Sequence, residues 1–275
     1  MLALLPPLVN STQAQLLISA GATVLDARST LHFYADGHLT TAVRVGWRIG
    51  TSGSPSDGSL GAVDAAAAQF AALGVRNDLP VLIVGDWDAG WGEEGRVYWD
   101  LEYLGHKDVH VLRGGMRAWT GPRSTISTWS ASAGDFVADP DSAKRVSTAQ
   151  LVAALAAPSP PQVWDVRDAS EFNGATPYGE TRGGHIPNAV NMPWRELLTA
   201  VPPQAQGPIV VTCTGGVRSG MAYLLLRDAL HDASPGALGD VSDASKVTVA
   251  NYDGGMWEWA RSSHPVSTSN DKTQR

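Results

Sequence analysis

The hydrophobic and polar positions of this chain alternate between short apolar runs and longer amphipathic segments. Short β-branched runs such as Val81–Val84 and Ile209–Val211 are typical of strands buried in a parallel sheet. Segments such as Ala62–Leu73 and Thr148–Leu155 are helix-compatible, and Ser147 supplies an N-cap for the second of them. The alternation predicts an α/β fold in which helices flank mostly parallel sheets.

The same order of segments occurs twice along the 275 residues. Four pairs of segments correspond, and these are Val24–Arg28 with Val163–Arg167, Gly37–Val43 with Gly184–Val190, Pro80–Val84 with Pro208–Thr212, and Val109–Trp119 with Val247–Trp259. Four matches in one order predict a duplication. We therefore expect a first domain, a Ser/Thr/Ala/Asp-rich linker, a second domain and a polar, disordered tail, at residues 1–125, 126–145, 146–265 and 266–275.

A glycine-rich loop follows the apolar run Ile209–Val211 and contains Cys213, the only cysteine of the chain. Residues from Met221 onward are helix-compatible, so the loop joins a strand to a helix. Glycines allow successive N–H groups to point inward, and a helix N-terminus adds positive charge, so an anion is stabilised there. The pattern favours a cradle for a nucleophilic Cys213 thiolate over the alternative, a buried structural cysteine.

Composition narrows the range of functions. A formal charge of −7 argues against nucleic acid and anionic membranes as partners. No apolar run approaches a membrane span, and the apolar segment Met1–Val9 lacks the basic flank of a signal peptide, so we expect a packed N-terminal arm and a cytoplasmic location. The seven histidines do not cluster at ligand spacing, so we expect no metal and no cofactor.

The two copies differ where the chemistry is expected. Counted from the proline before the strand, Gly85 stands opposite Cys213, and a shift of one residue places Asp86 there. Neither residue supplies a sulfur nucleophile, so we expect the first domain to be catalytically inactive. Polar residues that recur in both copies are expected to maintain the fold, and these are Asp26, Arg28 and His38 with Asp165, Arg167 and His185.

The chain resembles the tandem-domain rhodaneses, the family of thiosulfate and 3-mercaptopyruvate sulfurtransferases. The resemblance rests on Asp165–Arg167 with Glu171-Phe172, on Gly184–Trp194, on the Cys213 loop and on Asn251–Trp259. It implies that two rhodanese-like domains are present and that Cys213 carries a sulfane sulfur as a persulfide. It also implies that the active-site loop lines this sulfur with backbone N–H groups, from Thr214, Gly215, Gly216, Val217 and Arg218.

The loop sequence bears on the substrate. Mercaptopyruvate enzymes typically show Cys-Gly-Ser-Gly-Val-Thr, whereas Arg218-Ser219 here resembles the Cys-x-x-Gly-x-Arg-Ser form of some bacterial thiosulfate enzymes. Glu171 stands where mercaptopyruvate enzymes place an arginine. We expect thiosulfate as the small anionic donor, bound by Arg218 and Arg182. The acceptor is a thiophile such as cyanide or a protein, and 3-mercaptopyruvate is the alternative donor.

Two other functions are alternatives to sulfur transfer. Cysteine phosphatases that share this fold use Cys-x5-Arg, but here only four residues separate Cys213 from Arg218, which disfavours a phosphate loop. A regulatory rhodanese-like module that only binds partners is the other alternative. Such modules usually lack the cysteine, so the Cys213 loop disfavours this reading for the second domain.

Overall fold

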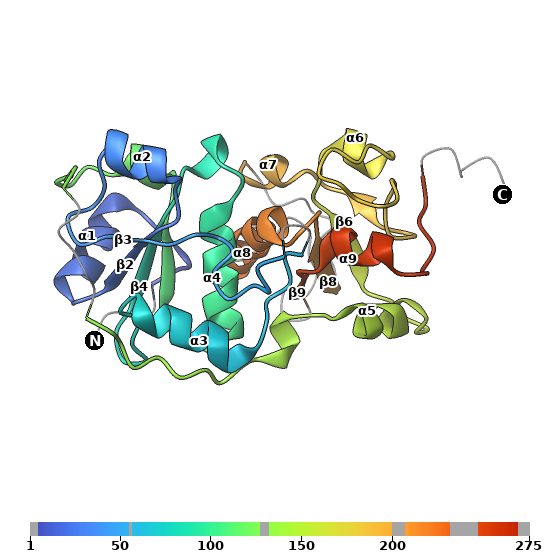
Figure 1. Cartoon of the computed structure of the whole chain (residues 1–275), viewed down its shortest axis with the longest axis horizontal. Helices are drawn as coiled ribbons and strands as arrows, with labels where there is room; N and C mark the ends of the chain where they lie inside the picture. The colour runs from blue at the N-terminus through green and yellow to red at the C-terminus, as the bar shows by residue number, and fades with distance from the viewer. Residues whose placement is uncertain (1–4, 55–56, 127–131, 200–206, 232–246, 269–275) are drawn as a thin grey trace. The chain divides into compact units, whose positions relative to one another are not determined.

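The structure is a computed structural model that describes residues 5–54, 57–126, 132–199, 207–231 and 247–268. The chain divides into two compact units (Figure 1). Unit 1 comprises Met1–Gly50 and Leu60–Asp141, and unit 2 comprises Thr51–Ser59 and Ser142–Arg275. Each unit contains a parallel sheet flanked by helices, which confirms the predicted fold class.

Unit 1 is built on a five-stranded sheet in the order β1-β5-β4-β2-β3, and all its strand pairs are parallel. Its strands are β1 (Leu8–Val9), β2 (Thr23–Asp26), β3 (Val43–Arg44), β4 (Val81–Val84) and β5 (Val109–Leu112). The central strand β4 is buried throughout, as its β-branched sequence predicts. The predicted N-terminal arm packs as the edge strand β1 beside β5, and its first four residues lie outside the described residues.

The helices of unit 1 follow their strands in the expected order. They are α1 (Ser11–Ser19), α2 (Thr30–Ala35), α3 (Val63–Ala72), α4 (Glu93–Tyr103), and the short 3-10 turns η1 (Trp87–Ala89) and η2 (Gly115–Ala118). Helix α4 begins at Glu93 and has Glu93 and Glu94 in its first turn. Acidic residues in a first turn interact favourably with the helix dipole, which favours a helix start at this position.

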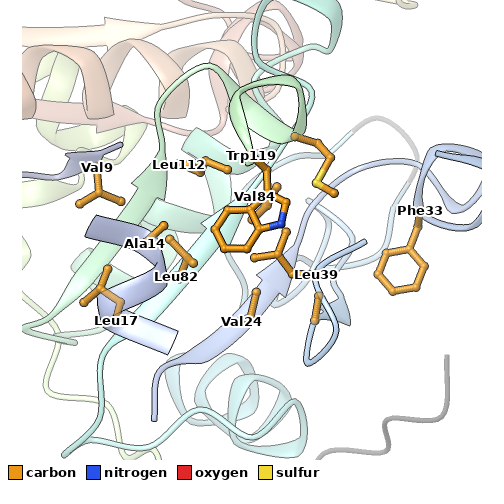
Figure 2. Packing of buried hydrophobic residues seen from close by; sticks show 12 residues of the cluster. Val9, Ala14, Leu17, Val24, Phe33, Leu39, Leu82, Val84, Leu112 and Trp119 are labelled. Atoms are coloured by element: carbon orange, nitrogen blue, oxygen red, sulfur yellow. The ribbon is translucent and has the colours of Figure 1, made fainter. Parts of the chain in front are cut away.

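The core of unit 1 is an apolar cluster on its sheet (Figure 2). Val24, Val84 and Leu112 come from three neighbouring strands, and α1 adds Ala14 and Leu17. Trp119, the last residue of the matched segment Val109–Trp119, lies among these side chains and is almost fully buried. This cluster packs on β4, and the loop that begins at Gly85 directly follows that strand.

Unit 2 repeats the architecture on a four-stranded sheet in the order β7-β6-β8-β9, again with all pairs parallel. Its strands are β6 (Gln162–Asp165), β7 (Val190–Asn191), β8 (Pro208–Thr212) and β9 (Thr248–Tyr252). Its helices are α5 (Thr148–Leu155), α6 (Ala169–Phe172), α7 (Trp194–Leu197), α8 (Val217–His231), α9 (Gly255–Arg261) and the 3-10 turn η3 (Ser142–Lys144). Ser147 caps α5 in a capping box with Gln150, so the predicted helix and its N-cap are confirmed.

Equivalent ion pairs follow the first strand of each repeat. Arg28 donates to Asp26 at 2.7 Å and Arg167 donates to Asp165 at 2.6 Å, and each pair is buried. The same guanidinium groups also donate to the carbonyl oxygens of Gly37 and Gly184, at 2.8 and 2.7 Å. The pairs therefore tie each strand to the next turn, which supports the expectation that these residues maintain the fold.

The linker and the tail were expected to lack packed structure. Residues 127–131 lie outside the described residues, but Phe136 is buried and the Asp139 N–H donates to the Leu104 carbonyl at 2.9 Å. Much of the predicted linker thus packs on unit 1. Residues 269–275 of the predicted tail lie outside the described residues, while Ser267 pairs with His185. The boundaries at residues 125 and 146 stay predictions.

Candidate active site

Cys213 lies between β8 and α8, at the carboxyl end of a buried strand. Its side chain is buried, with 1% relative exposure. Its Sγ accepts a hydrogen bond from the Gly216 N–H at 3.2 Å, and the Ser219 hydroxyl lies 3.5 Å away. Gly216 has φ +85°, a backbone conformation that glycine adopts readily. The predicted glycine turn around the sulfur is therefore present, and Ser219 is an additional neighbour that the sequence did not single out.

The helix after the loop begins earlier than expected. Helix-compatible sequence was expected from Met221, but α8 begins at Val217. Val217 and Arg218 are thus in the first turn of the helix, although they were predicted to be loop residues. An early start brings the positive end of the helix dipole close to Sγ.

Two carbonyl oxygens of the loop accept hydrogen bonds from backbone N–H groups at the N-terminus of α9. The Met256 N–H donates to the Cys213 carbonyl and the Trp257 N–H donates to the Thr214 carbonyl, each at 2.9 Å. Gly255 permits this approach, because a Cβ there would lie 2.5 Å from both oxygens. When carbonyls are held on the outside of a loop, its N–H groups are free to face an anion on the inside.

Arg218 forms a buried ion pair with Glu171 of α6. Its two terminal nitrogens donate to Glu171 at 2.6 and 2.7 Å, and both side chains are less than 5% exposed. Burial raises the pKa of Glu171, but the hydrogen bonds and charge of Arg218 outweigh burial and hold that pKa below its usual range. Burial lowers the pKa of Arg218, but the hydrogen bonds that it donates to Glu171 and its electrostatic interactions with Cys213 and Glu171 raise it above its usual value. Both groups are therefore charged.

The Thr214 hydroxyl connects this pair to a second carboxylate. It donates to Glu171 Oε1 at 3.0 Å, lies 3.4 Å from Glu180 Oε1 and accepts from Arg218 at 2.9 Å. The Arg218 guanidinium also lies over the Tyr178 ring, 5.5 Å from its centre. Two carboxylates and one guanidinium thus meet at the second residue of the loop. The sequence did not reveal this network, because its members are up to 47 residues apart.

Arg182 contacts the end of α9 and the segment that follows it. Its guanidinium donates to four carbonyl oxygens near the end of α9, those of Trp259, Ala260, Ser262 and His264, at 2.7 to 3.2 Å. These contacts hold the chain segment after α9 in place. The substrate-binding role expected for Arg182 stays a prediction that these contacts disfavour.

Unit 1 contains the counterpart of the cradle without its nucleophile. Asp26 pairs with Val84 and Asp165 with Thr212, so strand register places Gly85 opposite Cys213, as the first of the two sequence alignments predicts. A Cβ built on Gly85 would lie under 3.0 Å from the Glu94 carboxyl group. The Glu94 carboxyl therefore occupies the space that a nucleophilic side chain at Gly85 would need.

The loop after β4 in unit 1 also differs from the Cys213 loop in its ionisable groups. Glu94 is fully buried, and burial raises its pKa to about 8, although the Trp87 N–H donates to it at 2.9 Å. Asp86 lies 2.7 Å from His32 Nδ1 and, through its hydrogen bond and its charge, raises the pKa of that histidine. This loop therefore presents acidic groups in the region where unit 2 has the Cys213 thiol.

The described parts of the chain contain no group of three or more His, Cys, Asp or Glu side chains arranged to hold a metal ion. In the same described parts, no helix is long and apolar enough to cross a membrane.

Comparisons with known proteins agree with the repeat and the site. Residues 10–122 and 147–262 each match the model of the rhodanese-like domain. The thiosulfate sulfurtransferase of Azotobacter vinelandii is 27% identical over 286 residues, which cover 95% of this chain and 96% of that protein. The 3-mercaptopyruvate sulfurtransferase of Mus musculus is 30% identical over 246 residues, which cover 80% of this chain and 77% of that protein.

A solved structure shows the same fold. The crystal structure of SseA from Escherichia coli, a 3-mercaptopyruvate sulfotransferase with the rhodanese fold, superposes with a TM-score of 0.70 at 22% identity. The match covers 91% of this chain and 99% of that one. At this identity the similarity is one of fold.

Proposed function

Because this chain belongs to the rhodanese-like domain family and is a sulfurtransferase of that family, we propose that it transfers a sulfane sulfur from thiosulfate to a thiophilic acceptor through Cys213. The family resemblance stated from the sequence is confirmed by the two domain matches. The observation that carries the proposal is the position of Sγ, which accepts the Gly216 N–H at 3.2 Å beside the N-terminus of α8. Such a site stabilises negative charge on sulfur.

The proposed reaction has two displacements at sulfur. The Cys213 thiolate attacks the outer sulfur of thiosulfate, the S–S bond of the donor breaks, and sulfite leaves with the bonding electron pair. The acceptor, such as cyanide or a protein thiolate, then attacks the outer sulfur of the persulfide, and the Cys213 thiolate leaves. Each step conserves charge and needs no external oxidant. The same inward N–H groups serve the thiolate and the persulfide anion.

Stabilisation of the donor is assigned to the backbone and the helix N-terminus. Arg218 is already paired with Glu171, so it meets a dianion as part of a neutralised pair. Its bidentate contact and its hydrogen bond to Thr214 fix the first turn of α8. We therefore assign Arg218 mainly to holding the loop, with a smaller direct contribution to binding the donor.

The alternative donor is 3-mercaptopyruvate. A relative that is 30% identical carries that name, so the choice between donors rests on the site. Glu171, which stands where mercaptopyruvate enzymes place an arginine, is a carboxylate paired with Arg218, so this position offers no cation to the carboxylate of mercaptopyruvate. Thiosulfate is the smaller anion, and all of its charge lies close to the transferred sulfur.

The proposal is tested by intact-mass measurement after treatment with thiosulfate. The unmodified chain is expected to gain one sulfur, to lose it again when cyanide is added, and to gain none as Cys213→Ser. Sulfur uptake that survives this substitution would contradict the role of Cys213. A chain that binds thiosulfate and gains no sulfur would support the regulatory binding module instead. If kcat/KM is tenfold higher for 3-mercaptopyruvate than for thiosulfate, the donor is 3-mercaptopyruvate and the proposed donor is wrong.

A further inference from the structure

A turn from the first half of the sequence belongs to the unit that contains Cys213. Thr51–Ser59 is part of unit 2, and its turn at Asp57–Ser59 is held by side-chain hydrogen bonds. Asp57 accepts the Ser59 N–H at 2.8 Å and the Ser52 hydroxyl at 2.9 Å. The turn therefore has a defined shape, and the sequence repeat gives no sign of it.

Gly58 of this turn approaches the cradle more closely than any side chain would permit. A Cβ built on Gly58 would lie under 3.0 Å from the carbonyl oxygen, carbonyl carbon and Cα of Gly215. Gly58 does not have a positive φ, so glycine is needed there for space and not for backbone conformation. The backbone of Gly58 thus packs directly on the Gly215 peptide.

The Gly215 peptide is the one that presents an N–H to the sulfur. A peptide unit is planar and trans, so the Gly215 carbonyl and the Gly216 N–H point in opposite directions within one rigid plane. The Gly216 N–H donates to Cys213 Sγ at 3.2 Å. Whatever fixes the direction of the Gly215 carbonyl therefore also aims the Gly216 N–H at Sγ.

The carbonyls of the first two cradle residues are fixed by α9, through Met256 and Trp257. The third, that of Gly215, is contacted by Gly58. The next residue, Ser59, lies 3.3 Å from the Glu258 carboxylate through its hydroxyl, and Glu258 also bonds to Thr148 of α5. The turn is therefore attached to the same helix, α9, that fixes the other two carbonyls.

We propose that Gly58 is a positioning residue for sulfur transfer, which orients the Gly215–Gly216 peptide so that its N–H stabilises the Cys213 thiolate and persulfide. The inference rests on the proposed function, since it assigns a second part of the chain to the same reaction. It also gives the first half of the sequence a role in catalysis although its own cradle holds no thiol. An added methyl group at residue 58 would push the Gly215 carbonyl away and rotate the N–H off the sulfur.

The test compares Gly58→Ala with Gly46→Ala in the full chain. Gly46 is the matched control, because a Cβ there would meet no atom within 4 Å and its φ is not positive. The readout is the rate of alkylation of Cys213, the sole cysteine, by iodoacetamide as a function of pH, with thermal unfolding measured alongside. Gly58→Ala is expected to move the midpoint of this profile to higher pH by about half a unit or more. It is also expected to lower kcat for sulfur transfer about tenfold, while Gly46→Ala changes neither.

The outcomes separate positioning from folding. Identical alkylation profiles for Gly58→Ala and the control would overturn the proposal. If Gly58→Ala has no cooperative unfolding transition, Ser59→Ala decides, since it removes only the hydroxyl that reaches Glu258. An upward shift of its midpoint supports the proposal and an unchanged midpoint refutes it. Alkylation requires no sulfur donor, so this result does not depend on whether thiosulfate is the substrate.

Discussion

Arg218 and Glu171 face each other as a buried, bidentate ion pair, with donor–acceptor distances of 2.6 and 2.7 Å. The charge of Arg218, five residues after Cys213, is therefore balanced by Glu171 before any substrate arrives. Removing one partner of a buried pair leaves the other charge uncompensated, which is far more costly than the net value of the pair. This relationship makes Glu171 the residue that controls how much positive charge the cradle presents.

We predict that Glu171→Gln strengthens thiosulfate binding while it weakens the fold. The amide keeps the size of the side chain but removes the negative charge that balances Arg218, so attraction of a dianion increases and KM for thiosulfate is expected to fall roughly 3- to 10-fold. The free energy of unfolding is expected to fall by about 3 kcal/mol, because Arg218 stays buried. Steady-state kinetics and urea denaturation measure the two effects.

The matched control for this prediction is Glu196→Gln, an exposed carboxylate in the same unit. It is expected to change neither KM nor stability appreciably. An unchanged or higher KM for Glu171→Gln would mean that the donor does not sense the charge of Arg218.

Much of the fold follows from local sequence signals. Ser147 begins its helix because a serine N-cap satisfies helix N–H groups locally, and buried strands such as β8 are recognisable from their β-branched residues. The repeat also places Gly85 opposite Cys213, and the strand register agrees. These features depend on residues that are close in sequence or on a comparison of the two copies.

The parts of the site that were missed depend on contacts between distant residues. Nothing near Gly58 in the sequence indicates that it packs on Gly215, and the pairing of Glu171 with Arg218 appears only once α6 and α8 are folded. Arg182 was matched to a substrate-binding arginine by its residue type, whereas its actual contacts are backbone carbonyls after α9. Sequence shows which chemical groups are available, and tertiary packing decides which of them meet.

The contacts of Arg182 lead to a prediction about stability. Arg182→Ala removes four hydrogen bonds from a charged donor to carbonyls, each of which is worth about 1.5–3 kcal/mol when fully buried. Since this guanidinium is only partly buried, we expect a loss of about 2–4 kcal/mol in the free energy of unfolding. The kcat/KM for thiosulfate is expected to change less than about threefold, as Arg182 is assigned no contact with the donor.

Arg182→Lys is the control, because it keeps the charge but cannot donate to all four carbonyls. We expect it to lose nearly as much stability as Arg182→Ala. A large loss of kcat/KM in Arg182→Ala that Arg182→Lys restores would return Arg182 to the donor site.

The buried acid of unit 1 predicts a pH dependence of stability. The pKa of Glu94 is raised from 4.5 to about 8, so its proton is held more tightly in the folded chain than in the unfolded chain. As pH rises above 4.5 the unfolded state ionises first, and folding is progressively disfavoured until about pH 8. The substitution Glu94→Gln replaces the carboxyl group by a neutral amide and so removes this pH-dependent contribution to the free energy of unfolding. Glu94→Gln is expected to leave the free energy of unfolding nearly unchanged at pH 4.5 and to increase it by roughly 3–5 kcal/mol at pH 8, because each pKa unit corresponds to about 1.4 kcal/mol.

Denaturation of both proteins at several pH values between 5 and 8 measures this difference. Glu102→Gln, in the same helix and only partly buried, is the control and is expected to show no such slope. A difference that stays constant with pH would mean that Glu94 is ionised in the folded protein.

The last prediction concerns the reason that unit 1 has no nucleophile. A Cβ on Gly85 would overlap the Glu94 carboxyl group, so Gly85→Ala is expected to destabilise the chain by about 1–3 kcal/mol. The same substitution in a Glu94→Gln background is expected to cost as much, because glutamine fills the same space. In a Glu94→Ala background the space is open, and most of the cost of Gly85→Ala is expected to disappear. The coupling energy from this double-mutant cycle, measured by denaturation at pH 6, therefore isolates the overlap from the charge. Additive effects in the Glu94→Ala cycle would show that Glu94 does not occupy the place of the missing side chain.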